Sequence, residues 1–390
     1  MPKFYSFAIL ILFILISSAC ALQPRVPTPN ATLIFHNALL TAQAAAYTPT
    51  PLPSATQPPT HTVLPLTPTP VRTPPVLPGI FLSDQLNKLD VPSAYLKDTC
   101  QYLLNRWNPN NAAPGTVVMP IMFHSITKGE VKQADQISVG NFNLLMRSLK
   151  EQSFEAITVQ QLADFLDHNA KIPARSTVLI VDDRKSAVYF QDQFFKYYQD
   201  YHWIVTNAWI SFPDTLASLW DENAAMEKAG WVDHQAHGVI HNIPISAASS
   251  DAYIQSELQG SISAIEQHFG KKPIAYIWPG GGFTPKAAQV AQRLGYQLGF
   301  TINPRGPLMF NWIPLSGQPD PARPSFLPEG AVADPLMVLP RYWDTDAIVH
   351  IDTVRQIGKA AAILAEADKA TELEYYDIMC KPILGDIPKP

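Results

Sequence analysis

Proline is distributed so unevenly along this chain of 390 residues that it divides the chain into two parts. Fourteen of the 37 prolines lie in residues 21–79, among many threonines and without a hydrophobic period. Proline fixes φ and removes a backbone donor, so stretches such as 48–53 and 67–75 cannot form a helix or an inner strand. We therefore expect residues 21–79 to be a disordered, extended linker of the polyproline type.

The first twenty residues have the pattern of an export signal. Lys3 is followed by an apolar run over residues 7–16 and by small residues before Cys20, an order typical of a secretory signal. The apolar run is shorter than the roughly 20 residues of a membrane-spanning helix. Small residues ending in cysteine resemble a bacterial lipoprotein signal with Cys20 as the lipidated residue, although Ser17 stands where leucine is usual. We expect an exported protein anchored on the outer face of the cytoplasmic membrane or at the cell surface; plain signal cleavage and an uncleaved anchor are the alternatives.

The net charge and the other cysteines bear on partners and on folding. A formal net charge of −5 lacks the basic excess of nucleic-acid-binding proteins, so we expect no nucleic-acid partner and a neutral or polar substrate.

If Cys20 carries a lipid, Cys100 and Cys380 remain. In an exported chain two such thiols can form a disulfide, which here would tie the ends of the folded domain together. Two separate buried thiols are the alternative.

The chain after residue 79 alternates between apolar runs and helical patterns. The strand candidates are short apolar segments at residues 116–123, 177–181, 203–209, 274–278, 298–302 and 337–339. The helix candidates have apolar residues at helical spacing and cover residues 142–149, 254–265, 288–294 and 346–369. Strands that alternate with helices predict a parallel sheet or an α/β barrel, with reactive residues at the carboxyl ends of the strands. We expect an N-terminal helical extension at 80–113, a barrel at 114–345, and a C-terminal helix and tail at 346–390.

Polar residues and glycines follow several of these apolar segments. Asp182 and Asp183 follow one strand, and His124 ends another. The segment 274–278 leads into a turn of one proline and three glycines, and a pair of histidines spaced four apart begins at His237. Each feature alone has an ordinary explanation, because aspartates are common in turns, a lone histidine is usually a core residue, and Pro-Gly is a common turn.

The combination of these residues suggests amide hydrolysis. Two histidines and one carboxylate form a metal site with open positions for water, and the metal lowers the pKa of that water. A second carboxylate can accept its proton, a separate histidine can protonate the leaving amine, and exposed backbone N–H groups can stabilise an oxyanion. The chain has no Gly-x-Ser-x-Gly nucleophile motif.

In their order along the chain the four motifs, at residues 120–125, 180–184, 237–241 and 275–281, resemble those of the polysaccharide deacetylases. This family, which has the NodB-homology domain, is also called carbohydrate esterase family 4. The resemblance covers roughly residues 114–345. The Pro-Ile-Met-Phe-His-Ser segment is similar to a subgroup whose acid histidine precedes the Asp pair. The family fold is a distorted (β/α) barrel of about seven strands.

The resemblance implies a role for each motif residue. It assigns three ligands to one divalent metal, zinc or else cobalt, nickel or manganese: Asp183, His237 and His241. It implies that Asp182 is the general base, that His124 is the general acid, and that the backbone N–H of Gly280 helps to hold the oxyanion. The implied substrate is an N-acetylglucosamine-containing polymer such as peptidoglycan, a chitin-like chain or an exopolysaccharide, which would lose acetate.

The sequence departs from the family pattern at two positions. Arg184 replaces the glycine that usually follows the Asp pair, and its cation could narrow the groove, bind substrate, or lower the pKa of Asp182. No arginine closely precedes Pro279, where one family arrangement has the residue that orients the base. We expect Arg341 to take that part; a structural salt bridge is the alternative.

Aromatic residues near these motifs are candidates for binding sugar rings. Trp209, Trp278 and Trp343 each follow or end an expected strand, and packing in the core is the alternative for each. We expect a hydrolase that acts on an N-acetylated polysaccharide. The alternative of another class is a non-catalytic, glycan-binding surface lipoprotein on the same barrel, which the substitution at Arg184 favours. The motifs do not distinguish an N-acetyl group from another amide or ester.

Overall fold

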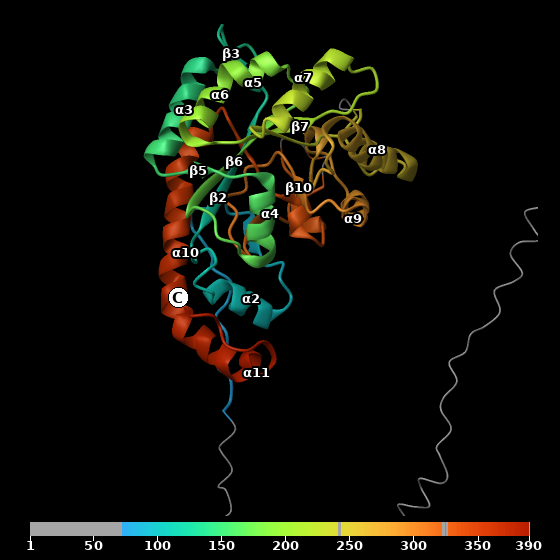
Figure 1. Ribbon diagram of the computed structural model, residues 1–390. Coiled ribbons are helices and arrows are strands. Elements are labelled where there is room, and N and C mark those ends of the chain that lie inside the picture. Colours follow the sequence, from blue (N-terminus) through green and yellow to red (C-terminus); the bar gives the residue numbers. More distant parts are fainter. Residues whose placement is uncertain (1–71, 241–242, 322–323, 325–326, 390) are drawn as a thin grey trace, which may run out of the picture. The chain divides into compact units, whose positions relative to one another are not determined.

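The computed structural model describes residues 72–240, 243–321, 324 and 327–389. The predicted signal segment with Cys20, most of the predicted linker, and His241 therefore lie outside the described residues. Figure 1 shows a parallel sheet wrapped into a barrel, with helices packed around its outer side. Within the described part of the chain, no helix combines the length and hydropathy that a membrane crossing requires.

Parallel strands form the wall of the barrel in the order β10-β9-β8-β7-β6-β2-β12. Their bounds are β2 Val117–Phe123, β6 Arg175–Asp182, β7 Val205–Trp209, β8 Val232–Ala236, β9 Ala275–Ile277, β10 Leu298–Phe300 and β12 Tyr342–Trp343. The longest ladder joins β2 to β6 over seven pairs, from Val117 opposite Arg175 to Phe123 opposite Val181. Alternate residues of these two strands enter different buried clusters. Burial on both faces explains why they are continuous apolar runs in the sequence.

A short seam closes the barrel between β10 and the segment that leads into β12. Leu339 forms a parallel bridge to Phe300, and its N–H donates to the carbonyl of Gly299 at 2.7 Å. A Cβ atom on Gly299 would lie 2.1 Å from the carbonyl oxygen of Met337. Glycine at this position is therefore what lets the two backbones approach closely enough for the ring to close. The fold is the distorted (β/α) barrel that the sequence predicted.

Helices cover the outer side of the barrel. They are α3 Val139–Glu151, α4 Val159–His168, α5 Ala187–Gln193, α6 Phe195–Tyr201, α7 Ala217–Lys228, α8 Asp251–Phe269, α9 Pro285–Leu294 and α10 Ala347–Tyr375. Their apolar positions recur at helical spacing, and several begin at a capping side chain; Thr158 and Gln161 form a reciprocal capping box on α4. The long helix α10 runs along one side of the barrel, and α8 and α9 lie on the other side (Figure 1).

The amino ends of the strands are closed by segments from both ends of the described chain. Helix α2, Thr99–Trp107, is joined by a disulfide from Cys100 to Cys380, in the π-helical turn that follows α10. Strand β1, Asp90–Ser93, pairs with β11, Ile313–Ser316, and α11, Lys381–Leu384, ends the fold.

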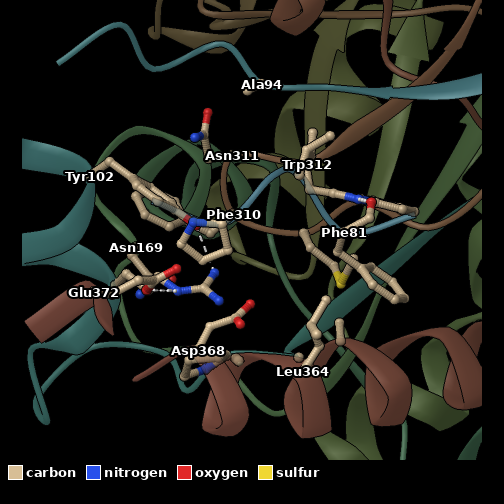
Figure 2. Close-up of a pocket in the computed structure, with 18 of the residues that line it drawn as sticks. Phe81, Ala94, Tyr102, Asn169, Phe310, Asn311, Trp312, Leu364, Asp368 and Glu372 are labelled. Carbon is tan, nitrogen blue, oxygen red and sulfur yellow. Dashed lines mark hydrogen bonds and ion pairs between the residues drawn. The ribbon is translucent and has the colours of Figure 1, made fainter. Parts of the chain in front are cut away.

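A cavity of about 220 Å³ lies between α2 and α10. Figure 2 shows aromatic side chains such as Trp312 and Phe81 on one wall, and the carboxylates of Asp368 and Glu372 on the other. Arg106 is paired with Glu372 at 2.9 Å and donates to the hydroxyl of Tyr102. The cavity is lined by residues 113–116, which precede β2, so it is not part of the cluster of motif residues described below.

The structure corrects the predicted elements in several places. Residues 335–338 form a 3-10 turn rather than a strand, and only Leu339 pairs with the sheet. Strand β8 was missed because its Val-Asp-His-Gln-Ala sequence is mostly polar. The extension at 80–113 contains β1 as well as α2. Three short strands were also missed: β3 Ser125–Thr127, β4 Gln136–Ser138 and β5 Glu155–Ala156.

Candidate active site

A sharp turn at the carboxyl end of β6 carries the two aspartates. Asp182 is the last residue of the strand, and Asp183 has a positive φ of 71°, an unusual conformation for a residue with a side chain. The buried amide of Asn207 on β7 donates to the carbonyls of Val181 at 3.0 Å and Asp183 at 2.9 Å. These two hydrogen bonds fix the turn, so that the two carboxylates leave the strand end in different directions.

Asp182 is held by a bidentate ion pair with Arg341. The two guanidinium nitrogens Nη1 and Nη2 donate to Oδ1 and Oδ2 of Asp182 at 2.6 and 3.0 Å, and Nε donates to the carbonyl of Thr301 at 2.7 Å. Both side chains are buried, at 2% and 0% exposure. Burial alone would raise the pKa of Asp182, but the charge and hydrogen bonds of Arg341, with smaller electrostatic contributions from the neighbouring histidines, outweigh it and hold that pKa well below its usual range. Asp182 is therefore ionised in the folded protein.

His124 lies directly after β2 and beside the same carboxylate. Its Nε2 atom is 3.6 Å from Oδ2 of Asp182. Its ring stacks on the indole of Trp343, with centroids 5.3 Å apart and planes within 14°. The indole can face His124 because β12 pairs with β2, with Trp343 opposite Met122. The stacking fixes the imidazole plane while its Nε2 edge faces the carboxylate.

His237 follows β8 and turns a nitrogen towards Asp183. Its Nδ1 atom is 2.8 Å from the carbonyl oxygen of Ile277, which can only accept, so Nδ1 carries a hydrogen and Nε2 is the nitrogen on the side of Asp183. This Nε2 is 3.9 Å from Oδ1 of Asp183. A metal-binding histidine is held in the same way, with one nitrogen donating to a carbonyl and the other directed at the ion.

The donor set fits a divalent metal as far as the structure describes it. His237 and Asp183 supply a neutral imidazole nitrogen and a carboxylate oxygen, the ligand types that zinc binds. The third predicted ligand, His241, lies outside the described residues, and those that are described contain no group of three or more potential ligands. His237 and Asp183 are thus brought together, and the metal ligand set remains a prediction.

A buried glutamate shapes the loop that begins at His237. The carboxylate of Glu257 on α8 accepts from the N–H of Val239 at 2.8 Å and from that of Ile240 at 3.0 Å. Gly238 has a φ of +78°, and a Cβ atom there would lie 2.7 Å from the Glu257 carboxylate. The loop therefore needs glycine at this position, for its backbone conformation and for the close approach of the carboxylate.

The glycine turn after β9 has an exposed glycine at its tip. Gly280 has a φ of +57°, while the N–H groups of Gly281 and Gly282 donate to the carbonyls of Trp278 and Pro279. Because these neighbouring N–H groups bond within the turn, they are not available to an oxyanion. The role of the Gly280 N–H stays a prediction.

Two of the three tryptophans predicted to bind substrate are core residues. Trp209 and Trp278 are both fully buried, and the indole nitrogen of Trp278 donates to the carbonyl of Met337 at 2.8 Å. A ring without exposed surface cannot stack on a sugar, so the prediction for these two residues was wrong and the packing alternative holds. Trp343 is partly exposed and lies against His124, and its substrate role stays a prediction.

Arg184 turns towards the segment that follows β7. Its Nη1 donates to the hydroxyl of Thr215 at 2.5 Å, and its guanidinium carbon lies 5.4 Å from the centre of the Phe212 ring. The ammonium of Lys185 is 3.7 Å from Oδ2 of Asp183. Arg184 is not among the charges that shift the pKa of Asp182 most, so that predicted effect belongs to Arg341.

The sequence analysis missed several residues that hold the site. Asn207 and Glu257 are buried polar residues on an apolar strand and on an otherwise amphipathic helix. A polar residue at a position that the hydrophobic pattern predicts to be buried can be noticed in the sequence. The sequence does not show which groups that residue binds. Asp344, directly after β12, is also buried, which raises its pKa to about 8, with a further contribution from the charge of Asp135.

Residues 169–299 match the family model described as polysaccharide deacetylase. No curated protein has a sequence that matches this chain.

Among solved structures, the deacetylase PplD of Streptococcus pyogenes in complex with acetate is 18% identical, with a TM-score of 0.44, over 58% of this chain and 92% of that one. A polysaccharide deacetylase from Bacillus cereus is 20% identical, with a TM-score of 0.45, over 61% and 69%. IcaB from Ammonifex degensii is 13% identical, with a TM-score of 0.47, over 62% and 97%. The family match covers the Asp pair, the histidine pair and the glycine turn, so this stretch of the chain is similar to a polysaccharide deacetylase domain.

Proposed function

We propose that the protein is a metal-dependent hydrolase that removes N-acetyl groups from an N-acetylglucosamine-containing polysaccharide. The observation that carries the proposal is the arrangement around Asp182. An ionised carboxylate, fixed by Arg341, lies 3.6 Å from His124, and Oδ1 of the next residue, Asp183, lies 3.9 Å from Nε2 of His237. A proton acceptor, a proton donor and metal ligands are therefore adjacent.

The chain's own residues divide the work of amide hydrolysis. Asp182 accepts a proton from the attacking water, and the two hydrogen bonds from Arg341 keep its oxygens in one orientation. His124 gives a proton to the leaving amine nitrogen, and stacking on Trp343 holds its ring in place. Asp183, His237 and His241 would hold a divalent metal, zinc in our proposal, which would supply Lewis acidity and lower the pKa of water at the site.

The alternative of a non-catalytic glycan-binding protein depended on Arg184. In the structure its guanidinium contacts Phe212 and Thr215 instead of forming an ion pair with Asp182 or Asp183. The substitution therefore leaves the Asp182–Arg341 pair intact, which supports the enzyme. We also propose, from the first twenty residues, that the protein is exported and held at the outer face of the membrane through a lipid on Cys20.

The test measures acetate release and bound metal together. The purified protein is incubated with chito-oligosaccharides and Zn²⁺ or Co²⁺, and its metal content is measured by mass spectrometry. We expect acetate release from the wild type, loss of turnover with retained metal in Asp182→Asn, and loss of both in His237→Ala. Full turnover in Asp182→Asn would overturn the assignment of the base. A wild type that neither binds metal nor releases acetate would favour the glycan-binding alternative.

A further inference from the structure

Arg184 has a fixed position beside the proposed catalytic centre but no acidic partner. Its side chain is partly exposed and follows Asp183 directly. No ion pair joins its guanidinium to a carboxylate among the described residues. By contrast, Arg106, Arg305 and Arg341 are each paired with an acidic residue. Arg184 therefore keeps a full positive charge that no carboxylate of the described protein neutralises.

Neutral groups fix the position of this charge. The Phe212 ring lies against the guanidinium, and the Thr215 hydroxyl accepts from Nη1. Phe212 is itself exposed, so both groups lie where the segment after β7 borders the solvent. A guanidinium held on an aromatic face loses little freedom when it binds an anion, and its remaining N–H donors match a carboxylate.

The neighbouring charges leave Arg184 available for a ligand. Lys185 is 3.7 Å from Asp183 and compensates that carboxylate, and Arg341 compensates Asp182. The two aspartates are therefore already balanced within the protein, and Arg184 is an additional cation next to them. Its charge is best satisfied by a group on the substrate.

We infer that Arg184 selects substrates in which a carboxylate lies on, or next to, the N-acetylated sugar. This inference rests on the proposed function and narrows its substrate class from neutral chitin-like chains to acidic N-acetylated glycans. It also refines the expectation of a neutral or polar substrate, because one local cation can recognise an acidic sugar although the whole chain has a net charge of −5. Salt bridges of this kind are specific when the arginine is bidentate.

The experiment compares substrates that differ only in charge. A hyaluronan tetrasaccharide, in which uronates alternate with N-acetylglucosamine, is assayed beside its carboxyl-reduced form, and kcat/KM for acetate release is measured for each. A glycan fragment containing N-acetylmuramic acid, assayed with its own carboxyl-reduced form, tests a carboxylate on a lactyl ether instead of a uronate. We expect at least a tenfold preference for the acidic member of one pair, and we expect it to weaken as salt is raised.

Three variants show whether Arg184 causes the preference. Arg184→Gln removes the charge and should reduce the preference to less than twofold, whereas Arg184→Lys keeps the charge and should retain part of it. Arg147→Gln removes one charge from an exposed position on α3 and should keep the full preference. Equal kcat/KM values for both members of both pairs in the wild type, or an intact preference in Arg184→Gln, would overturn the inference.

Binding separates a failure of this inference from a failure of the proposed function. If no probe releases acetate, the proposed function fails, and titration calorimetry of the same pairs still tests Arg184. A dissociation constant at least tenfold lower for an acidic member, lost in Arg184→Gln, would support the inference without turnover. Equal binding of both members in both pairs would refute it.

Discussion

Replacement of Arg341 by methionine tests the central ion pair of the proposed site. The substitution removes two hydrogen bonds to Asp182, at 2.6 and 3.0 Å, and leaves a carboxylate that is only 2% exposed without its bidentate partner. Hydrogen bonds to charged groups contribute about 1.5–3 kcal/mol each, and loss of one partner of a buried pair costs about 3–5 kcal/mol. We expect the free energy of unfolding at pH 7 to fall by about 3–5 kcal/mol.

The assay is urea unfolding of the wild type, Arg341→Met, Asp182→Asn and the double variant. Since the second substitution removes the stranded charge, the double variant should lose less than the sum of the single losses, with a coupling of about 2–3 kcal/mol. The pKa of Asp182 is depressed, so the stability from the pair is complete above about pH 4 and is lost as pH falls through the folded-state pKa. A loss below about 1 kcal/mol in Arg341→Met, or no coupling, would refute a buried ion pair.

Three further predictions concern other parts of the fold. Burial raises the pKa of Asp344 to about 8, so at this residue the folded protein keeps a proton that the unfolded chain releases, and its contribution to stability should fall from about pH 4 to 8. Unfolding free energies measured across this range should show a slope in Asp344→Asn that differs from the wild type by up to one proton, in the direction of higher stability with pH. An unchanged slope would contradict the shift. Gly238→Ala should cost about 1–3 kcal/mol in urea unfolding, from its positive φ and the contact with Glu257; a loss within error would contradict the strain. Joint replacement of Cys100 and Cys380 by alanine should cost about 2–5 kcal/mol, since the bridge joins residues 280 apart, and an unchanged thermal midpoint would show that the bridge does not stabilise the fold.

Much of the barrel was predictable because its signals are local. The β2 and β6 segments are apolar runs since both of their faces are buried, and α3, α8 and α9 show helical spacing with capping residues at their starts. Strand β8 was not predictable in this way. Its His234 and Gln235 are buried polar residues whose partners, Glu227 and the backbone at Ile274, come from other elements. A strand whose buried polar side chains form hydrogen bonds with other elements shows no alternating hydrophobic pattern in the sequence.

The sequence by itself determined the chemistry available at the site, since residue types and their order along the chain indicate Asp182, Asp183, His237 and His124. Only the tertiary structure decided their partners. Arg341 lies 159 residues from Asp182 in the chain and reaches it because the seam at Leu339 closes the barrel. Packing also buried two tryptophans that the sequence could not distinguish from exposed aromatic residues: Trp278 donates to Met337 at the seam, and Trp209 packs against Trp220 and Phe269 of the outer helices. Ion pairs and burial depend on contacts between segments that are far apart in the sequence, and these contacts exist only once the chain has folded.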